Sequence, residues 1–168
     1  GITTLYNPFF NVSHNLASCW QARAFMDEDF LLINGDTVFE ADVLNDVLAS
    51  PTAPITLTID QKETYDEDDM KVELEGLQVR HVSKILKPEQ THAESIGMLY
   101  FRGEGPSLFR EALETAMRKP TGLKSWFLSV VDNLATKNLV QACQISSGRW
   151  AEIDFIVSFR GQTWAIEA

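Results

Sequence analysis

The stretch "FLLINGDTVFEADVL", residues 30–44, constrains the fold more than any other part of the chain. A short apolar run, "FLLIN" (30–34), leads straight into Gly35-Asp36, and an amphipathic helical pattern follows over 40–50. Because the run is apolar on both faces, it predicts a buried strand of the kind found in parallel sheets. An aspartate placed directly behind such a strand needs either a turn role or a chemical role.

The order of the remaining patterns predicts an α/β domain with a Rossmann-like, mostly parallel sheet and a small antiparallel insertion in the middle. We expect one domain over residues 1–168, since no linker or repeat divides the chain. Further strands are expected at 2–7, 55–60, 71–76, 77–86, 94–102 and 139–146, with an extended piece at 149–155. Helices are expected at 16–26, 40–50, 106–119 and 122–137, and residues 156–168 follow no clear pattern.

Composition excludes several classes of protein. The net charge of −10 disfavours nucleic acid, which is held through Lys and Arg. No apolar run approaches the length of a membrane span, and the first residues lack a signal-peptide pattern. The two cysteines, Cys19 and Cys143, have no CxxC spacing, so we expect reduced thiols in a cytoplasmic protein.

Two aspartates suggest a metal site. Asp36 follows the strand at 30–34, and Asp154 ends the extended segment "WAEID". Ligands of open α/β sheets bind at the carboxyl ends of strands, and Mg²⁺ prefers carboxylate and phosphate oxygens. The alternative is structural: Asp36 caps the next helix, and Glu152 and Asp154 are solvated edge charges.

Six motifs in order make the chain recognisable: "NPFFNVSHNLASCWQAR", "FLLINGDTVFE", "YDEDDMKV", "VSKIL", "ESIGMLYFRGEG" and "WAEIDF". With them the chain resembles the nucleotidyltransferase family that makes nucleotide-activated sugars and alcohols, most closely its phosphocholine cytidylyltransferase-like branch. The resemblance implies a GT-A, Rossmann-like core. It also implies transfer of a nucleotidyl group from an NTP, of the CTP type, to phosphocholine or a sugar phosphate, with release of pyrophosphate.

The resemblance also implies roles for particular residues. Asp36 and Asp154 would hold Mg²⁺ between the α-phosphate and the incoming phosphate, whose own oxygen is the nucleophile. The other implied positions are Lys71 at the reaction centre, Asn15 and Ser18 beside the substrate pocket, and Lys84, Glu94 and Ser95 on the acceptor side. The alternative for the two lysines is that they are ordinary surface charges.

Three tryptophans suggest how a quaternary ammonium group would be held. Trp20, Trp126 and Trp150 are candidates for an aromatic box that attracts such a cation through its ring faces. The alternative is that they pack in the core, which we favour for Trp20.

The chain departs from the family pattern at its front. The family's GxGxR phosphate-binding loop occurs nowhere in the sequence, and residues 2–7 correspond to the family's third strand. The resemblance therefore implies an N-terminally truncated core that is weak or inactive alone. Because a sheet edge would lie open, we expect a homodimer, with exchanged N-terminal segments as one arrangement. The alternative function is a non-catalytic relic, or a domain that binds small ligands or oligomerises.

Overall fold

The computed structural model describes residues 1–146, 148–153, 155–159 and 162–166. Its strands are β1 (Phe30–Ile33), β2 (Thr37–Phe39), β3 (Ile55–Asp60), β4 (Lys71–Glu75), β5 (Gln78–Ser83), β6 (Ala93–Phe101), β7 (Val140–Gln144), β8 (Trp150–Glu152), β9 (Phe155–Phe159) and β10 (Gln162–Ile166). The α-helices are α1 (Asn15–Ala22), α2 (Ala41–Ala49), α3 (Gly105–Met117) and α4 (Phe127–Ala135). Short 3₁₀ turns cover Arg23–Phe25, Pro88–Gln90 and Gly122–Lys124.

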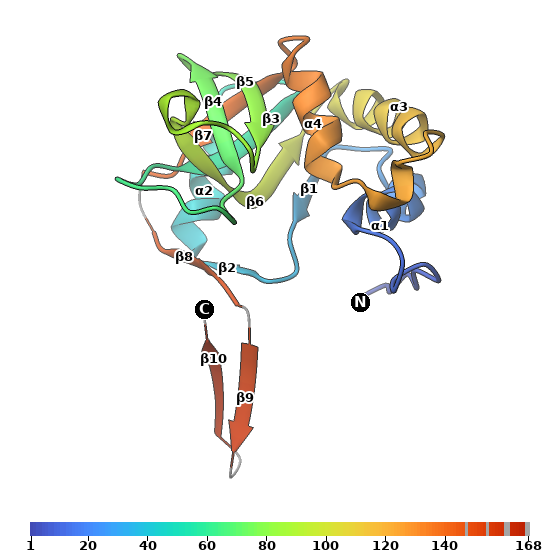
Figure 1. Ribbon diagram of the computed structural model, residues 1–168, viewed down its shortest axis with the longest axis horizontal. Coiled ribbons are helices and arrows are strands. Elements are labelled where there is room, and N and C mark those ends of the chain that lie inside the picture. Colours follow the sequence, from blue (N-terminus) through green and yellow to red (C-terminus); the bar gives the residue numbers. More distant parts are fainter. Residues whose placement is uncertain (147, 154, 160–161, 167–168) are drawn as a thin grey trace.

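The main sheet has the strand order β1-β6-β3-β7-β5-β4, and β4 also pairs with β6. The second pairing closes five of the six strands into a barrel, with β1 added outside it on β6 (Figure 1). Along one edge of β6, β1 pairs with residues 98–101 and β4 pairs with residues 93–94. The end of β1 and the start of β4 therefore flank a notch at residues 95–97 of β6.

The prediction of a mostly parallel sheet is wrong. Among the described residues, β3 with β7 is the one parallel pair in the main sheet, and its other pairings are antiparallel. In β1, Phe30 and Leu32 pack against the larger core and Leu31 packs against the smaller one. Apolar residues on both faces of a strand thus indicated correctly that both faces are covered, but they carry no information about strand direction.

The two cores lie on opposite faces of the sheet. The larger core includes Leu16 of α1, Phe109 of α3 and Val131 of α4, and Figure 1 shows these three helices gathered on one side of the molecule. The smaller core packs Val43 and Val47 of α2 against β6 and β7. Both cysteines are free, as expected.

The N-terminal residues differ from expectation. Residues 2–7 form no strand, and Ile2 and Tyr6 are largely exposed. In the described structure this segment pairs with no strand. The Asn7 side chain at its end donates hydrogen bonds to Ser13 and Ser18. Residues 2–7 therefore do not fill a place beside β1. In the part of the chain that the structure describes, β1 pairs with β6 alone and its other edge is open.

Two smaller pairings complete the chain. β2 pairs antiparallel with β8, so that Thr37 lies opposite Glu152. β9 and β10 form an antiparallel hairpin, whose residues, apart from Phe155, follow no clear pattern in the sequence. No helix in the described ranges has the length and apolar character that a membrane span requires.

Candidate functional site in the notch of β6

The notch is built by a bulge in β6. The register with β3 shifts between Leu57 and Ile59, and Gly97 has a φ of 74°. The turn that follows β1 docks on this bulge: the Asn34 amide donates to the Gly97 carbonyl at 2.9 Å, and Thr37 Oγ1 donates to the Ile96 carbonyl at 3.2 Å. Bulges of this kind redirect a strand beside a site.

Only glycine fits at position 97. A Cβ there would lie 2.6 Å from Asn34 Nδ2 and 3.0 Å from Thr37 Oγ1, in a backbone conformation that side chains disfavour. Asn34 and Gly97 thus fix where the next residues of the turn lie.

Asp36 lies at the tip of this turn, and its side chain is exposed. The backbone carbonyl of Asp36 accepts a hydrogen bond of 2.9 Å from the amide of Ile153, continuing the β2–β8 pairing. Two segments 117 positions apart in the chain therefore meet at Asp36. Asp154 lies outside the described residues. In the described part of the chain, no three His, Cys, Asp or Glu side chains group as a metal site.

Lys71 begins β4 on the far side of the notch. It is 7% exposed, and its ammonium donates to the backbone carbonyls of Asp66 and Lys84, the latter at 3.1 Å. An ammonium has three N–H donors, so one remains. Within the described ranges, no carboxylate oxygen lies within 4.0 Å of this ammonium. A buried cation without a counter-ion is costly, and it suits a site that binds an anion.

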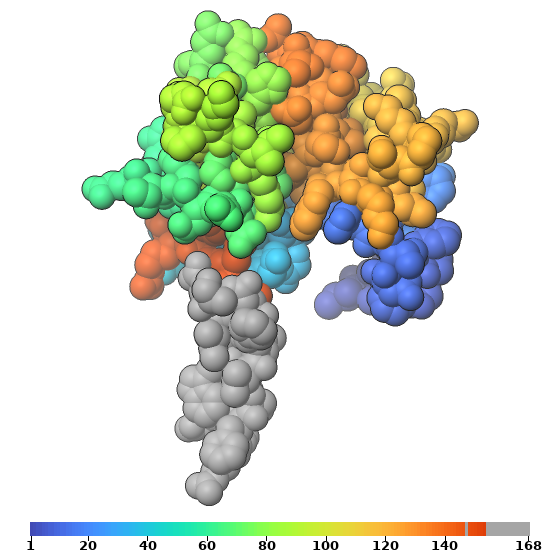
Figure 2. Space-filling model, in the orientation of Figure 1, coloured from blue at the N-terminus to red at the C-terminus, as the bar shows by residue number. Residues whose placement is uncertain are grey.

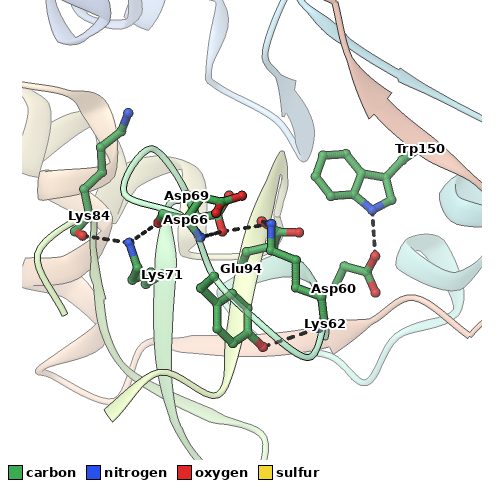
Figure 3. A network of polar contacts seen from close by, with 9 residues as sticks. Asp60, Lys62, Asp66, Asp69, Lys71, Lys84, Glu94 and Trp150 are labelled. Atoms are coloured by element: carbon green, nitrogen blue, oxygen red, sulfur yellow. Dashed lines mark hydrogen bonds and ion pairs between the residues drawn. The ribbon is translucent and has the colours of Figure 1, made fainter. Parts of the chain in front are cut away.

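Glu94 lies opposite Lys71 in the β4–β6 register and belongs to a charged cluster that the sequence analysis missed (Figure 3). Lys62 contacts the carboxylates of Glu94 and Asp69, each at 2.8 Å. Figure 3 shows the Lys62 ammonium between these carboxylates, with Asp60 farther along and bonded to the Trp150 indole at 2.8 Å.

Burial governs the protonation of this cluster. Glu94 is 6% exposed, and loss of hydration, with the nearby Asp69 charge, raises its pKa to about 7 in spite of Lys62. Burial also opposes ionisation of Asp69, but hydrogen bonds from Lys62 and the Asp66 amide outweigh it and lower the pKa of Asp69. Burial alone would lower the pKa of Lys62, yet its two carboxylate partners raise it.

Ser95 lies at the floor of the notch between these groups. Its amide donates to the Met70 carbonyl at 2.8 Å, and its Oγ accepts from the Gly97 amide at 3.3 Å. Ser95 is buried, so its contacts in the structure are with the backbone that shapes the notch.

Lys84 connects the notch to Trp126. The Lys84 ammonium lies 5.4 Å from the centre of the Trp126 ring, within cation–π range, and 3.6 Å from exposed Asp68. Trp126 is 44% exposed, and its ring also stacks on His14, with ring centres 5.0 Å apart. This aromatic surface already accommodates a cation.

Asn15 and Ser18 make contacts that stabilise the fold. Asn15 Oδ1 accepts a hydrogen bond of 2.9 Å from the Phe127 amide and so satisfies the first N–H of α4. Ser18 Oγ accepts from Asn7 Nδ2 at 3.1 Å and holds the N-terminal loop. Asn15 lies next to the stacked pair of His14 and Trp126, and Ser18 lies one turn further along α1.

The three tryptophans do not share a contact. Trp20 donates to Glu114 at 2.9 Å, carries the Arg23 guanidinium over its ring and packs against the larger core, as we favoured. Trp150 bonds to Asp60, and no ring contact joins any two of the tryptophans in the described ranges. Of the three tryptophans proposed for the aromatic box, Trp126 is the one that is exposed to solvent in the described structure.

A cleft of about 660 Å³ opens beside the cluster. Its lining residues are Gln61, Lys62, Glu63, Thr64, Tyr65, Lys71, Pro88, Thr91 and His92. Figure 2 shows the segment around residue 65, in blue-green, at the outer surface of the molecule. Lys62 of the cluster and Lys71 beside the notch therefore both line this solvent-accessible cleft.

The fold is that of the nucleotidyltransferases. The chain superimposes on the inositol-1-phosphate CTP transferase of T. maritima with a TM-score of 0.70 and 16% identity, over 88% of this chain and 58% of that one. It superimposes on the CTP:phosphocholine cytidylyltransferase of Streptococcus pneumoniae with a TM-score of 0.72 and 13% identity, over 92% and 64% of the two chains.

A curated protein is also similar in sequence. The CMP-5'-(3-aminopropyl)phosphonate synthase of Streptomyces rubellomurinus is 27% identical over 154 residues, which cover 88% of this chain and 24% of that protein. No protein-family model matches the chain. The resemblance to nucleotidyltransferases is thus confirmed, and the chain spans about a quarter of the curated relative and about 60% of the solved ones.

Proposed function

We propose that this chain carries the metal-binding and acceptor-binding part of a CTP-type nucleotidyltransferase that acts on a small phosphorylated or phosphonylated compound. The observation that carries the proposal is Lys71, a buried ammonium that has no carboxylate partner among the described residues. It lies across the notch from the end of β1, the strand that leads into Asp36. A phosphate or phosphonate placed there would supply the missing negative charge.

The metal would be Mg²⁺, held by Asp36 and Asp154. The hydrogen bond from Ile153 to the Asp36 carbonyl supports this, because Ile153 directly precedes Asp154 in the sequence. Such an ion would neutralise charge on the phosphates as they approach. The residues then bind and orient: Lys71 holds an acceptor oxyanion, and the Asn34–Gly97 contact fixes the turn that carries Asp36.

The other end of the acceptor would lie toward Trp126. Lys84 already places an ammonium near the Trp126 ring, so a quaternary or primary ammonium of the substrate can take the same place if Lys84 turns away. Two of the solved relatives are a phosphocholine and an inositol-phosphate enzyme, and the curated relative is a CMP-5'-(3-aminopropyl)phosphonate synthase. A cationic acceptor is therefore our first choice and a sugar phosphate the second.

Acceptor binding is the direct test. We would titrate the chain with phosphocholine, 3-aminopropylphosphonate and hexose 1-phosphates, with Mg²⁺ present, by calorimetry. We expect binding that Lys71→Ala weakens by at least about tenfold and Lys119→Ala leaves unchanged, because Lys119 is exposed at the end of α3. Lack of binding by every acceptor, or equal binding by both variants, contradicts the proposal.

Catalysis is tested by pyrophosphate release with each NTP. The 168 residues contain no GxGxR motif, so we expect slow release that Asp36→Ala abolishes. The second candidate function is a non-catalytic domain that binds small ligands or oligomerises. Acceptor binding without pyrophosphate release would favour it, and release that persists in Asp36→Ala would exclude the proposed metal role.

A further inference from the structure

The cleft beside the cluster has the chemistry of an oxyanion site. Lys62 and Lys71 line it together with hydroxyl-bearing Thr64, Tyr65 and Thr91. Two ammonium groups and the hydroxyls of Thr64 and Tyr65 suit the oxygens of a tetrahedral anion, whereas the Thr91 hydroxyl already donates to the Lys87 carbonyl. Lys71 has an N–H to spare, whereas Lys62 is held by carboxylates.

Lys62 ties together three parts of the chain. It lies near the start of the 61–70 loop, Asp69 lies near the end of the same loop, and Glu94 lies on β6. One ammonium thus fastens both ends of the loop to the sheet. Lys62 is about one-third exposed, so its side chain has room to move toward the cleft that it lines.

Of the two carboxylates that contact Lys62, Glu94 is the one that ionises less readily. The charged groups that face it are Lys62 and Asp69 in contact, Asp60 opposite on β3 and Lys71 opposite on β4. Burial and the neighbouring carboxylate make the ionised form costly and raise the pKa of Glu94 to about 7, whereas Asp69 stays ionised because its pKa is lowered. Near neutral pH the cluster therefore changes between two charge states through Glu94.

We propose that this cleft is a proton-gated oxyanion site: ionised Glu94 and Asp69 together hold Lys62 away from the ligand, and protonation of Glu94 weakens this hold, so that Lys62 turns from Asp69 to join Lys71 on a tetrahedral oxyanion. The proton comes from solvent and goes to a Glu94 carboxylate oxygen, and Lys62 keeps its charge throughout. The inference rests on the proposed function only in identifying the oxyanion with the acceptor's phosphate or phosphonate.

The test uses sulfate, whose charge is constant around neutral pH, and needs neither CTP nor Mg²⁺. We would measure sulfate affinity of the 168-residue chain by NMR chemical-shift titration at about pH 6 and about pH 8. About a tenth of Glu94 is protonated at the higher pH and about nine-tenths at the lower, so we expect affinity to rise up to about tenfold on acidification. Absence of sulfate binding at about pH 6 would overturn the proposal.

Four variants test whether Glu94 and Lys62 cause the pH dependence of sulfate affinity. Glu94→Gln, which resembles the protonated side chain, should bind tightly at both pH values, and Lys62→Met should bind weakly at both. The exposed controls Glu111→Gln and Lys119→Ala should behave as the natural chain does. NMR spectra that match the natural chain confirm that each variant is folded.

His92 is the competing explanation. It also lines the cleft, and a histidine can gain charge on acidification. A Glu94→Gln variant that keeps the full pH dependence would assign the effect to His92 and overturn the proposal. Unchanged sulfate affinity in Lys62→Met would overturn it as well. Because sulfate binding requires no nucleotide, failure of pyrophosphate release leaves this test intact.

Discussion

Replacing Glu94 by glutamine should make the protein more stable above neutral pH. Glu94 is 6% exposed, and its burial raises its pKa from 4.5 to about 7. The folded chain therefore binds this proton more tightly than the unfolded chain does. The free energy of unfolding therefore falls as the pH rises from about 4.5 to about 7, and above about pH 7 this decrease is complete.

The structure sets the size of the effect. At about 1.4 kcal/mol for each pKa unit, the raised pKa of Glu94 corresponds to a loss of about 3 kcal/mol. Glutamine carries no charge at any pH and avoids this loss. The free energy of unfolding of Glu94→Gln relative to the natural chain should thus rise by about 3 kcal/mol between about pH 5 and about pH 8, roughly a 10 °C gain in melting temperature.

Urea unfolding of both proteins at several pH values measures this difference. Glu111→Gln, at an exposed position of α3, is the matched control and should show no pH-dependent gain. If the natural chain and Glu94→Gln differ by the same amount at about pH 5 and about pH 8, the reasoning about burial at this position is refuted.

Three further predictions follow from the fold. Gly97→Ala should lower the free energy of unfolding by about 2 kcal/mol, and Gly76→Ala by about 1 kcal/mol. Both glycines have a positive φ, but only at position 97 would the added Cβ contact the Asn34 side chain, so equal losses in thermal unfolding would refute the packing argument. Asn15→Ala should cost about 1 kcal/mol through the first N–H of α4, and Ser18→Ala much less; equal losses in urea unfolding would contradict the capping role. The open edge of β1 predicts a dimer by light scattering that Ile33→Lys dissociates, and a natural chain that stays monomeric at high concentration would refute it.

The sequence predicted most elements but misjudged how they pair. The apolar run at β1, the alternation at β4 and β5 and the amphipathic patterns at α2, α3 and α4 each reflect local burial, and the structure confirms them. Strand direction depends on partners far along the chain, so β6 could not be seen to run antiparallel to both β1 and β3. Residues 2–7 have strand-forming side chains, but without a partner edge they form no strand.

The candidate site, too, was predictable from the sequence only in part. Asp36 was identifiable because it follows a buried strand, and the family resemblance pointed to Lys71 and Glu94, which the β4–β6 register brings together. Lys62 was missed, since its contacts with Asp69 and Glu94 arise only when the 61–70 loop folds back on β6. Its position two residues after β3 was the available signal, because functional residues often follow strand ends.

We propose above that Asp36 and Asp154 bind a single metal ion. Titration with Mn²⁺, followed by electron paramagnetic resonance, tests it most directly, because free and bound ions are counted without any nucleotide. We expect one bound ion in the natural chain, its loss in both Asp36→Asn and Asp154→Asn, and no change in the exposed control Asp42→Asn. Binding that survives in either of the first two variants, or no bound ion in the natural chain, would contradict the claim.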